Sequence, residues 1–166
     1  MLLHVQHPLA NGCKEVTICC IHTDVVVLAV ATFQQFGLET LWIGFGRNKD
    51  FRWFPIHDNL EDLGIHAVGL PFFHAFTGCD TVSAFRRKAK KSAWQTLEVF
   101  PDSTDVFTRL SKRPHSLLET DMEIKEAFVC IMYNRWTDTF VVNKARLDCL
   151  LENNGRTRQF LLPWTL

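Results

Sequence analysis

The first half of the chain alternates short apolar runs with one long apolar run. Residues 15–21 (EVTICCI) are β-branched and nearly continuously apolar, which is typical of a central parallel strand covered on both faces. The run that begins at Asp24 and stops at Gly37 is too long for most strands and predicts a buried helix. Residues 40–45 and 51–54 predict two further strands. Strand, helix and strand in this order predict a right-handed βαβ crossover in a parallel sheet.

The rest of the chain has a helical pattern. A helix is predicted over residues 67–76, with Pro71 near its beginning or at a kink, and a linker over residues 101–105. Further helices are predicted over residues 57–63, 90–99, 121–133 and 143–152. The expected fold class is α/β, with a partial parallel sheet flanked by helices and then a mostly helical C-terminal region. We expect residues 101–166 to extend the domain formed by residues 1–100.

Charge is balanced over the whole chain but not along it. The 166 residues contain 18 basic and 18 acidic side chains, a length that suits one domain. Residues 1–80 hold 4 Lys/Arg and 8 Asp/Glu, a net of −4, and residues 81–166 hold 14 and 10, a net of +4. The cysteines are irregularly spaced and the chain does not start like a leader peptide, which predicts an intracellular protein. Its apolar runs are too short for a membrane helix, so we expect no membrane association.

Two carboxylates follow buried elements. Asp24 comes after the strand at 15–21, and Asp80 comes after the apolar segment at 67–76. Sites in open α/β sheets form beyond the carboxyl ends of the strands, and two converging carboxylates repel unless a hard cation such as Mg²⁺ lies between them. This arrangement favours metal-dependent phosphodiester cleavage. The alternative is that both residues are helix N-caps.

Five cations occupy six positions directly after Asp80 and lead into a predicted helix: Arg86, Arg87, Lys88, Lys90 and Lys91. We call these residues the basic cluster. Such clusters bind phosphate backbones, and the backbone N–H groups of a helix N-terminus add to the attraction. A solvated basic face and a targeting signal, which would place the protein in the nucleus, are the other two interpretations.

Two motifs resemble a known family. HTDVVVLAV (residues 22–30) and FHAFTGCDTVSAF (residues 73–85), followed by a Lys-rich helix start, resemble the second half of flap-endonuclease-like (XPG-type) PIN nuclease domains. They are also similar to mobile-element-associated proteins that carry TDTDVVVLAV and HAFTGCDT motifs. The resemblance covers residues 15–100 and implies a partial PIN/5′-nuclease-like fold. It further implies Mg²⁺, or Mn²⁺ in its place, as cofactor and branched or single-stranded DNA as partner.

The resemblance assigns roles by position. Asp24 matches the second Asp of the family's Asp-x-Asp pair, and Asp80 matches the Asp of its Gly-Cys-Asp, so both are expected as catalytic metal ligands. Residues 81–99 occupy the place of the helix-two-turn-helix that grips DNA phosphates. His22 stands at the first Asp of the pair, where it would orient or replace a ligand. Arg87-Lys88-Ala89 stands at the family's Gly-x-Gly turn.

The family's N-terminal half has no counterpart before the first strand, so the resemblance implies a fragment with an incomplete set of acidic ligands. The sequence hypothesis is therefore a divergent metal-dependent nuclease-like domain that binds DNA through the basic cluster and, if active, is a structure-specific nuclease. The alternative is a catalytically inactive interaction or structural domain of mobile-element origin. An unpaired sheet edge would then be covered by a protein partner.

Two further residues carry weaker expectations. His74 lies on an apolar helix, and a satisfied core histidine is the favoured interpretation, ahead of a residue that lines the site. Cys79 lacks an obvious base, because His74 would have to fold back toward it for nucleophilic catalysis.

Overall fold

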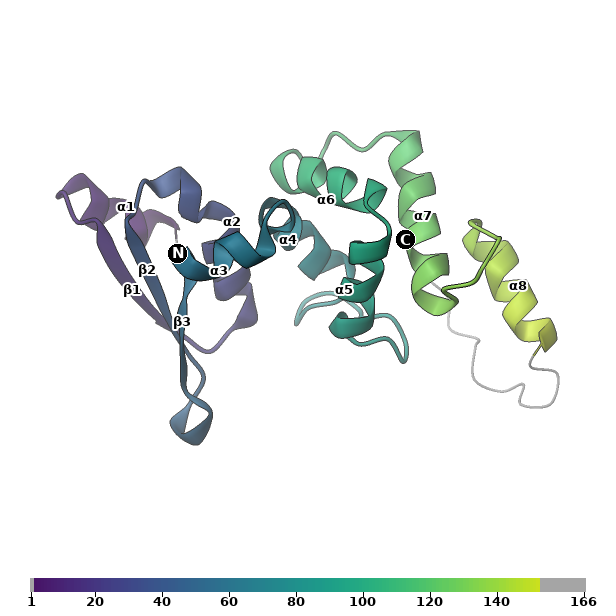
Figure 1. Ribbon diagram of the computed structural model, residues 1–166, viewed down its shortest axis with the longest axis horizontal. Coiled ribbons are helices and arrows are strands. Elements are labelled where there is room, and N and C mark those ends of the chain that lie inside the picture. The colour runs from purple at the N-terminus through teal and green to yellow at the C-terminus, as the bar shows by residue number, and fades with distance from the viewer. Residues whose placement is uncertain (1, 153–166) are drawn as a thin grey trace. The chain divides into compact units, whose positions relative to one another are not determined.

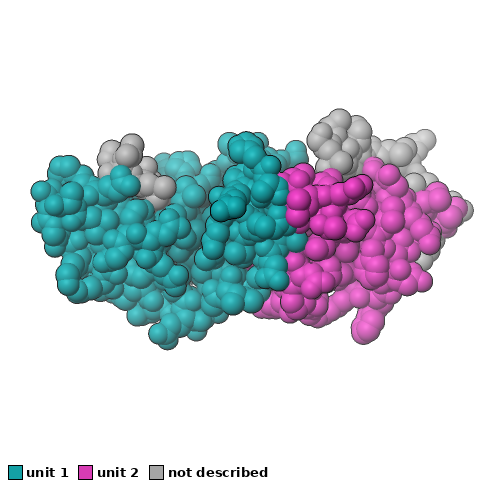
Figure 2. All heavy atoms as spheres, turned by 90° about the horizontal axis from the view of Figure 1, so that it is seen from above, with its two compact units in different colours: residues 1–87, 104–116 teal, residues 88–103, 117–166 magenta. Residues whose placement is uncertain are grey.

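The computed structural model describes residues 2–152 and divides the chain into two compact units (Figure 2). The first unit comprises residues 1–87 and 104–116, and the second comprises residues 88–103 and 117–166. The first unit contains a small sheet with helices, and the second is helical. The fold class is therefore α/β, with helices predominating.

The sheet has three strands in the order β1 (Glu15–Cys20), β2 (Thr40–Phe45) and β3 (Arg52–Pro55) (Figure 1). The strands β1 and β2 are parallel and are connected through helix α2 (Thr23–Phe36), which confirms the predicted strand–helix–strand unit. Strand β3 is antiparallel to β2, so the expectation of a wholly parallel sheet is wrong. The connection, which holds the 3-10 turn Asn48–Asp50, is much shorter than the dozen or more residues that a parallel crossover needs.

Strand β1 lies at an edge of this sheet, and its side chains alternate between half-buried and exposed. Val16 and Ile18 pack toward the core, whereas Thr17 and Cys19 are exposed. The prediction of a central strand covered on both faces is therefore wrong. Cysteine counts as apolar in the sequence pattern, and the exposed Cys19 made an alternating strand look like a continuous apolar run.

Four helices precede residue 87 and share the first unit with the sheet: α1 (Leu2–Ala10), α2, α3 (Ile56–Leu63) and α4 (His66–Phe76). One core joins them to the inward face of the sheet, with buried side chains from Val5, Val30, Ile43, Leu60 and Ala67 among others. Helix α2 ends at Gly37 with φ 64°, a left-handed conformation that glycine adopts without a steric penalty. The predicted stop at that residue is confirmed.

Helix α6 (Asp102–Lys112) occupies the place of the predicted linker at residues 101–105, so that prediction is wrong. The preceding helix ends at Val99, and Pro101 directly precedes α6, where its missing N–H costs no helical hydrogen bond. From residue 104 onward α6 belongs to the first unit, where buried Phe107 contacts the rings of Phe72, Phe73 and Phe76. Pro71 lies in the middle of α4, and the next backbone N–H, that of Phe72, donates to Ser111 Oγ at 3.0 Å.

The second unit contains α5 (Lys90–Val99), α7 (Glu119–Tyr133) and α8 (Val142–Glu152). These helices confirm the predicted ones, with starts that differ by no more than two residues. Helix α5 packs against α7, and α7 against α8. Buried Asp121 accepts a hydrogen bond from the Leu118 N–H at 2.8 Å, which holds the start of α7. No helix within residues 2–152 is both long and apolar enough to cross a membrane.

Candidate functional site

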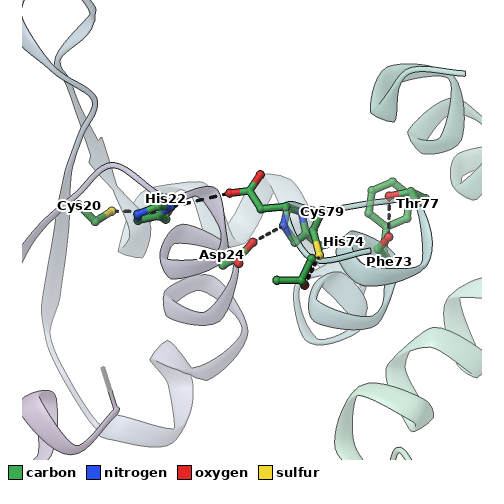
Figure 3. Close-up of polar contacts among 9 residues, drawn as sticks. Cys20, His22, Asp24, Phe73, His74, Thr77 and Cys79 are labelled. Carbon is green, nitrogen blue, oxygen red and sulfur yellow. Dashed lines mark hydrogen bonds and ion pairs between the residues drawn. The ribbon is translucent and has the colours of Figure 1, made fainter. Parts of the chain in front are cut away.

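The two sequence motifs meet at the N-terminal end of α2. Asp24 lies in the first turn of α2, and His74 projects from α4, which packs against α2. The two side chains point toward each other, with His74 Nε2 2.7 Å from Asp24 Oδ1 (Figure 3). His74 is 8% exposed, so this imidazole is held in a buried position by the packing of the two helices.

The N-cap residue of α2 is not the one that the sequence suggested. His22, and not Asp24, is the N-cap residue of α2, and it makes no side-chain capping hydrogen bond. Asp24 lies inside the first turn, where its negative charge interacts favourably with the helix dipole. Asp80 caps no helix, because α5 begins at Lys90 with Ala89 as its N-cap residue. The N-cap interpretation of the two aspartates is therefore wrong.

His22 and Asp80 form a second, exposed pair. His22 Nδ1 lies 3.8 Å from Asp80 Oδ2, and both side chains are mostly accessible to solvent. Exposed pairs of this kind contribute little to stability, because water screens them and the side chains lose entropy. Each of the two predicted aspartates is thus paired with a histidine, Asp24 in a half-buried position and Asp80 at the surface.

A tight turn after α4 returns the chain toward the site. Gly78 has φ 100°, and a Cβ at this position would lie 2.5 Å from Ala84 Cα, so only glycine fits. Cys79 and Val82 exchange two backbone hydrogen bonds of 3.2 Å that close the turn. Cys79 Sγ consequently lies near His74 and Asp24, and the expectation that His74 and Cys79 remain apart is wrong.

The environment of Cys79 favours its thiolate. Thr81 Oγ1 lies 3.4 Å from Cys79 Sγ. Hydrogen bonding from the Thr81 side chain, and then from the Thr81 and Val82 backbone, lowers the pKa of the Cys79 thiol below its usual value. The Asp24 carboxylate acts in the opposite direction but more weakly.

Asp24, His74 and Cys79 each offer one donor atom, and these atoms all lie within 4.8 Å of one another. Within residues 2–152 this is the one group of three or more metal-ligand side chains that lies so close together. Mg²⁺ prefers an all-oxygen set, whereas this set contains one oxygen, one nitrogen and one sulfur atom. The donors therefore fit the expected Mg²⁺ poorly.

The basic cluster begins where the first unit ends and continues into the second. Arg86, Arg87, Lys90 and Lys91 have exposed side chains. Lys88 is half-buried, with Nζ 5.2 Å from the centre of the Tyr133 ring and 3.5 Å from the Tyr133 carbonyl oxygen. Arg87 has φ 59°, in the left-handed region that favours glycine.

A shallow pocket of about 260 Å³ lies in the second unit, lined by residues of α5 and by the end of α7. Lys88 and Arg135 place two cations on its wall, and Ser92, Gln95 and Thr96 add polar atoms. Nothing in the sequence pattern indicated this pocket, because Arg135 lies more than forty residues beyond the basic cluster.

Neither family models, nor curated proteins, nor solved structures give a match to this chain. The site must therefore be interpreted from its own residues. Sequence reasoning selected Asp24, Asp80 and His22 as site residues, but it did not place His74 and Cys79 beside Asp24. A usable signal was that Cys79 is the middle residue of the Gly-Cys-Asp motif and that His74 lies four residues before it, since a helix that ends in a glycine turn brings its last residues close to those that follow.

Proposed function

We propose that this chain is a divergent nuclease-type domain, related to the flap-endonuclease-like PIN superfamily, that binds DNA through its phosphates. The observation that carries the proposal is the meeting of the two motifs in space. Asp24 and His74, fifty positions apart, are 2.7 Å from each other, and His22 and Asp80 are 3.8 Å apart. A nuclease site of this type requires the strand-end motif and the Gly-Cys-Asp motif to converge in this way.

The backbone after the site supports the proposed relationship. Residues 81–89 form a loop that leads into α5, which is where the resemblance expects the DNA grip to begin. Arg87 stands at a glycine position of the family's turn, and its φ of 59° is a conformation that glycine adopts readily. A left-handed residue at that point is consistent with an ancestral glycine turn.

The start of α5 supports phosphate binding. Lys90 and Lys91 lie in the first turn of α5, where the helix dipole disfavours positive charge. Ala89, the N-cap residue, offers no side-chain capping hydrogen bond to the first N–H groups. An anion at this end would interact favourably with both lysines and with those N–H groups. In the same unit, Lys88 and Arg135 on the pocket wall supply further positive charge for a phosphate.

DNA binding is tested by fluorescence anisotropy with labelled single-stranded and flap DNA over a series of salt concentrations. The double variant Lys90→Ala/Lys91→Ala is expected to weaken binding and to reduce the slope of log K against log salt by about 1–2. The matched control is Lys49→Ala/Arg52→Ala, which removes two exposed cations from the β2–β3 region and should leave the slope unchanged. Equal slopes for all three proteins would reject the proposed role of the basic cluster.

Cleavage is tested separately with the same substrates and Mg²⁺, Mn²⁺ or Zn²⁺. If the domain is an active nuclease, we expect Asp80→Ala and Asp24→Asn to abolish cleavage while binding through the basic cluster persists. Cleavage that survives Asp80→Ala would reject the proposed site. DNA binding without cleavage by any of the three metals would identify an inactive, nucleic-acid-binding descendant of the nuclease fold.

The exposed face of the sheet supports a second candidate function, that of an interaction domain. Trp42, Phe51 and Trp53 are 38%, 39% and 53% exposed, and no strand within residues 2–152 pairs with the outer edge of β1. Exposed aromatic groups beside an open strand edge are typical of surfaces that bind other proteins. If DNA affinity is absent at low salt and the Trp42→Ser/Trp53→Ser variant changes the association state of the protein, this second function is favoured.

A further inference from the structure

We propose that Asp24, His74 and Cys79 form a binding site for a zinc-type divalent cation, with a fourth coordination position left open. Zn²⁺ binds the combination of carboxylate oxygen, imidazole nitrogen and thiolate sulfur that these residues offer. Three protein ligands with one position left for water are typical of catalytic rather than structural zinc sites. This inference goes beyond the proposed function and does not depend on it, because metal binding requires no DNA.

The distances among the three donor atoms are close to those between the ligands of one tetrahedral zinc ion. Zn–N and Zn–O bonds of about 2.0–2.2 Å and a Zn–S bond of about 2.3 Å place tetrahedral ligands roughly 3.3–3.8 Å from one another. All three donor atoms lie within 4.8 Å of one another, and His74 Nε2 lies 2.7 Å from Asp24 Oδ1. The upper limit of 4.8 Å and the 2.7 Å pair each lie within about 1 Å of this range.

The fold holds the three ligands on separate supports. Asp24 is fixed by the first turn of α2 and His74 by the buried face of α4. Cys79 is held by the turn that Gly78 and the two Cys79–Val82 hydrogen bonds create. Because the helices pack against each other, little conformational entropy is lost when a metal joins the ligands.

Metal binding changes the protons at the site. The hydrogen bond between His74 Nε2 and Asp24 Oδ1 is replaced by one bond from each atom to the metal. The proton of that hydrogen bond leaves to solvent, and Nδ1 carries the single proton of the neutral imidazole. Cys79 gives up its thiol proton to solvent and binds as thiolate. No oxidant or reductant takes part.

The test uses the full chain and Co²⁺, which occupies zinc sites and gives a thiolate-to-metal charge-transfer band when sulfur is a ligand. We expect one equivalent of Co²⁺ to produce this band and Zn²⁺ to abolish it by displacement. Cys79→Ser should remove the band and weaken Zn²⁺ binding by at least about 100-fold, since it deletes a direct ligand. The matched control is Cys19→Ser, which changes an exposed cysteine of β1 and should leave the band intact.

A second measurement uses the unmodified chain, so its result does not depend on whether a variant folds. In the unmodified chain, Zn²⁺ is expected to slow alkylation of Cys79 and not that of Cys13, which is exposed near the start of β1; peptide mass spectrometry reports both. The proposal fails if the native chain shows no thiolate band, if the band survives Cys79→Ser, or if Zn²⁺ does not protect Cys79. It also fails if Mg²⁺ displaces Co²⁺ as effectively as Zn²⁺ does, because an oxygen-preferring site would then be present.

Discussion

The two faces of the sheet in the first unit are built from the same strands but meet different surroundings. On one face, Val16, Ile18 and Ile43 pack against helices, and Ile43 is fully buried. On the other, Thr17, Cys19 and Trp42 are exposed. The register of β1 and β2 keeps the buried and exposed side chains on opposite faces, because Thr17 pairs with Trp42 and Ile18 with Ile43. Each step along a strand moves a side chain from one environment to the other.

The difference teaches that an apolar residue in a strand is not necessarily a buried one. The open face carries Trp42, Phe51 and Trp53. The side chains of Phe51, Trp53 and Cys19 lie over Gly44 on this face. Sheets in parallel α/β proteins are usually covered on both faces. Here the apolar residues of the open face form a surface of their own, whose contribution to stability can be compared directly with that of the covered face.

The largest expected effect is on the covered face. Ile43→Ala should lower the free energy of unfolding by about 2–5 kcal/mol, because it leaves a cavity beside Ile18 and Phe54. Trp53→Ala, on the open face, should cost at most about half as much although it removes a larger side chain, because Trp53 is already half exposed. Urea unfolding measures both. Equal losses would mean that the open face is as well packed as the covered one.

Neighbouring cysteines on β1 give the next test. Cys19 is exposed, whereas burial raises the pKa of the Cys20 thiol, so Cys20 holds less thiolate at neutral pH. Iodoacetamide should therefore alkylate Cys19 faster than Cys20 at pH 7. The ratio should shrink as the pH rises toward the raised pKa of the Cys20 thiol, because Cys20 then ionises too.

Single variants Cys19→Ser and Cys20→Ser, each followed by mass spectrometry, assign the two rates. A Cys20 that reacts as fast as Cys19 at pH 7 would show that β1 opens from the helices on the time scale of the reaction.

A smaller change in the free energy of unfolding is expected at Gly44, over which side chains of the open face lie. A Cβ there would lie 2.7 Å from Phe51 Cζ and 3.0 Å from Trp53 Cζ3. Gly44→Ala should cost about 1 kcal/mol, the low end for overpacking, because both contacts are ring atoms that can move outward. The double variant with Phe51→Ala should recover part of this loss in urea unfolding. No recovery would place the strain elsewhere.

The smallest effect is expected at Thr17. Thr17→Lys should change the free energy of unfolding by less than about 0.5 kcal/mol, because the new charge remains in water. Ile18→Lys, one position along, should cost about 2 kcal/mol or more, since it brings a charge toward the core. If Thr17→Lys is as damaging as its neighbour, another part of the protein covers the open face in solution.

Much of the local structure was predictable from the sequence. Residues 40–45 and 90–99 form the predicted strand and helix without any shift in their ends, and Gly37 ends α2 as expected. Two helices, α1 and α6, were not predicted, and a nearby proline explains each case. Helix α1 contains Pro8, and α6 follows directly after Pro101, so both positions look like helix breakers in a sequence pattern although the packing of Val5 and Phe107 favours helix.

The candidate site was predictable only in part. Asp24 and Asp80 could be chosen because they follow apolar segments, and His22 because it belongs to the first motif. His74 was assigned to the core because it lies on an apolar helix, and it is indeed buried, but its Nε2 faces Asp24 across the α2–α4 contact. A one-dimensional pattern gives the face of a helix and not the partner that the face meets.

The sequence by itself determined the strand–helix–strand unit, the helix stop at Gly37 and the concentration of cations after Asp80, since each follows from local backbone preferences or from side-chain charge. The tertiary structure alone decided which sheet face is covered, that β3 runs antiparallel, and that Asp24, His74 and Cys79 share one place. These features depend on contacts between segments far apart in the chain, which no local preference specifies.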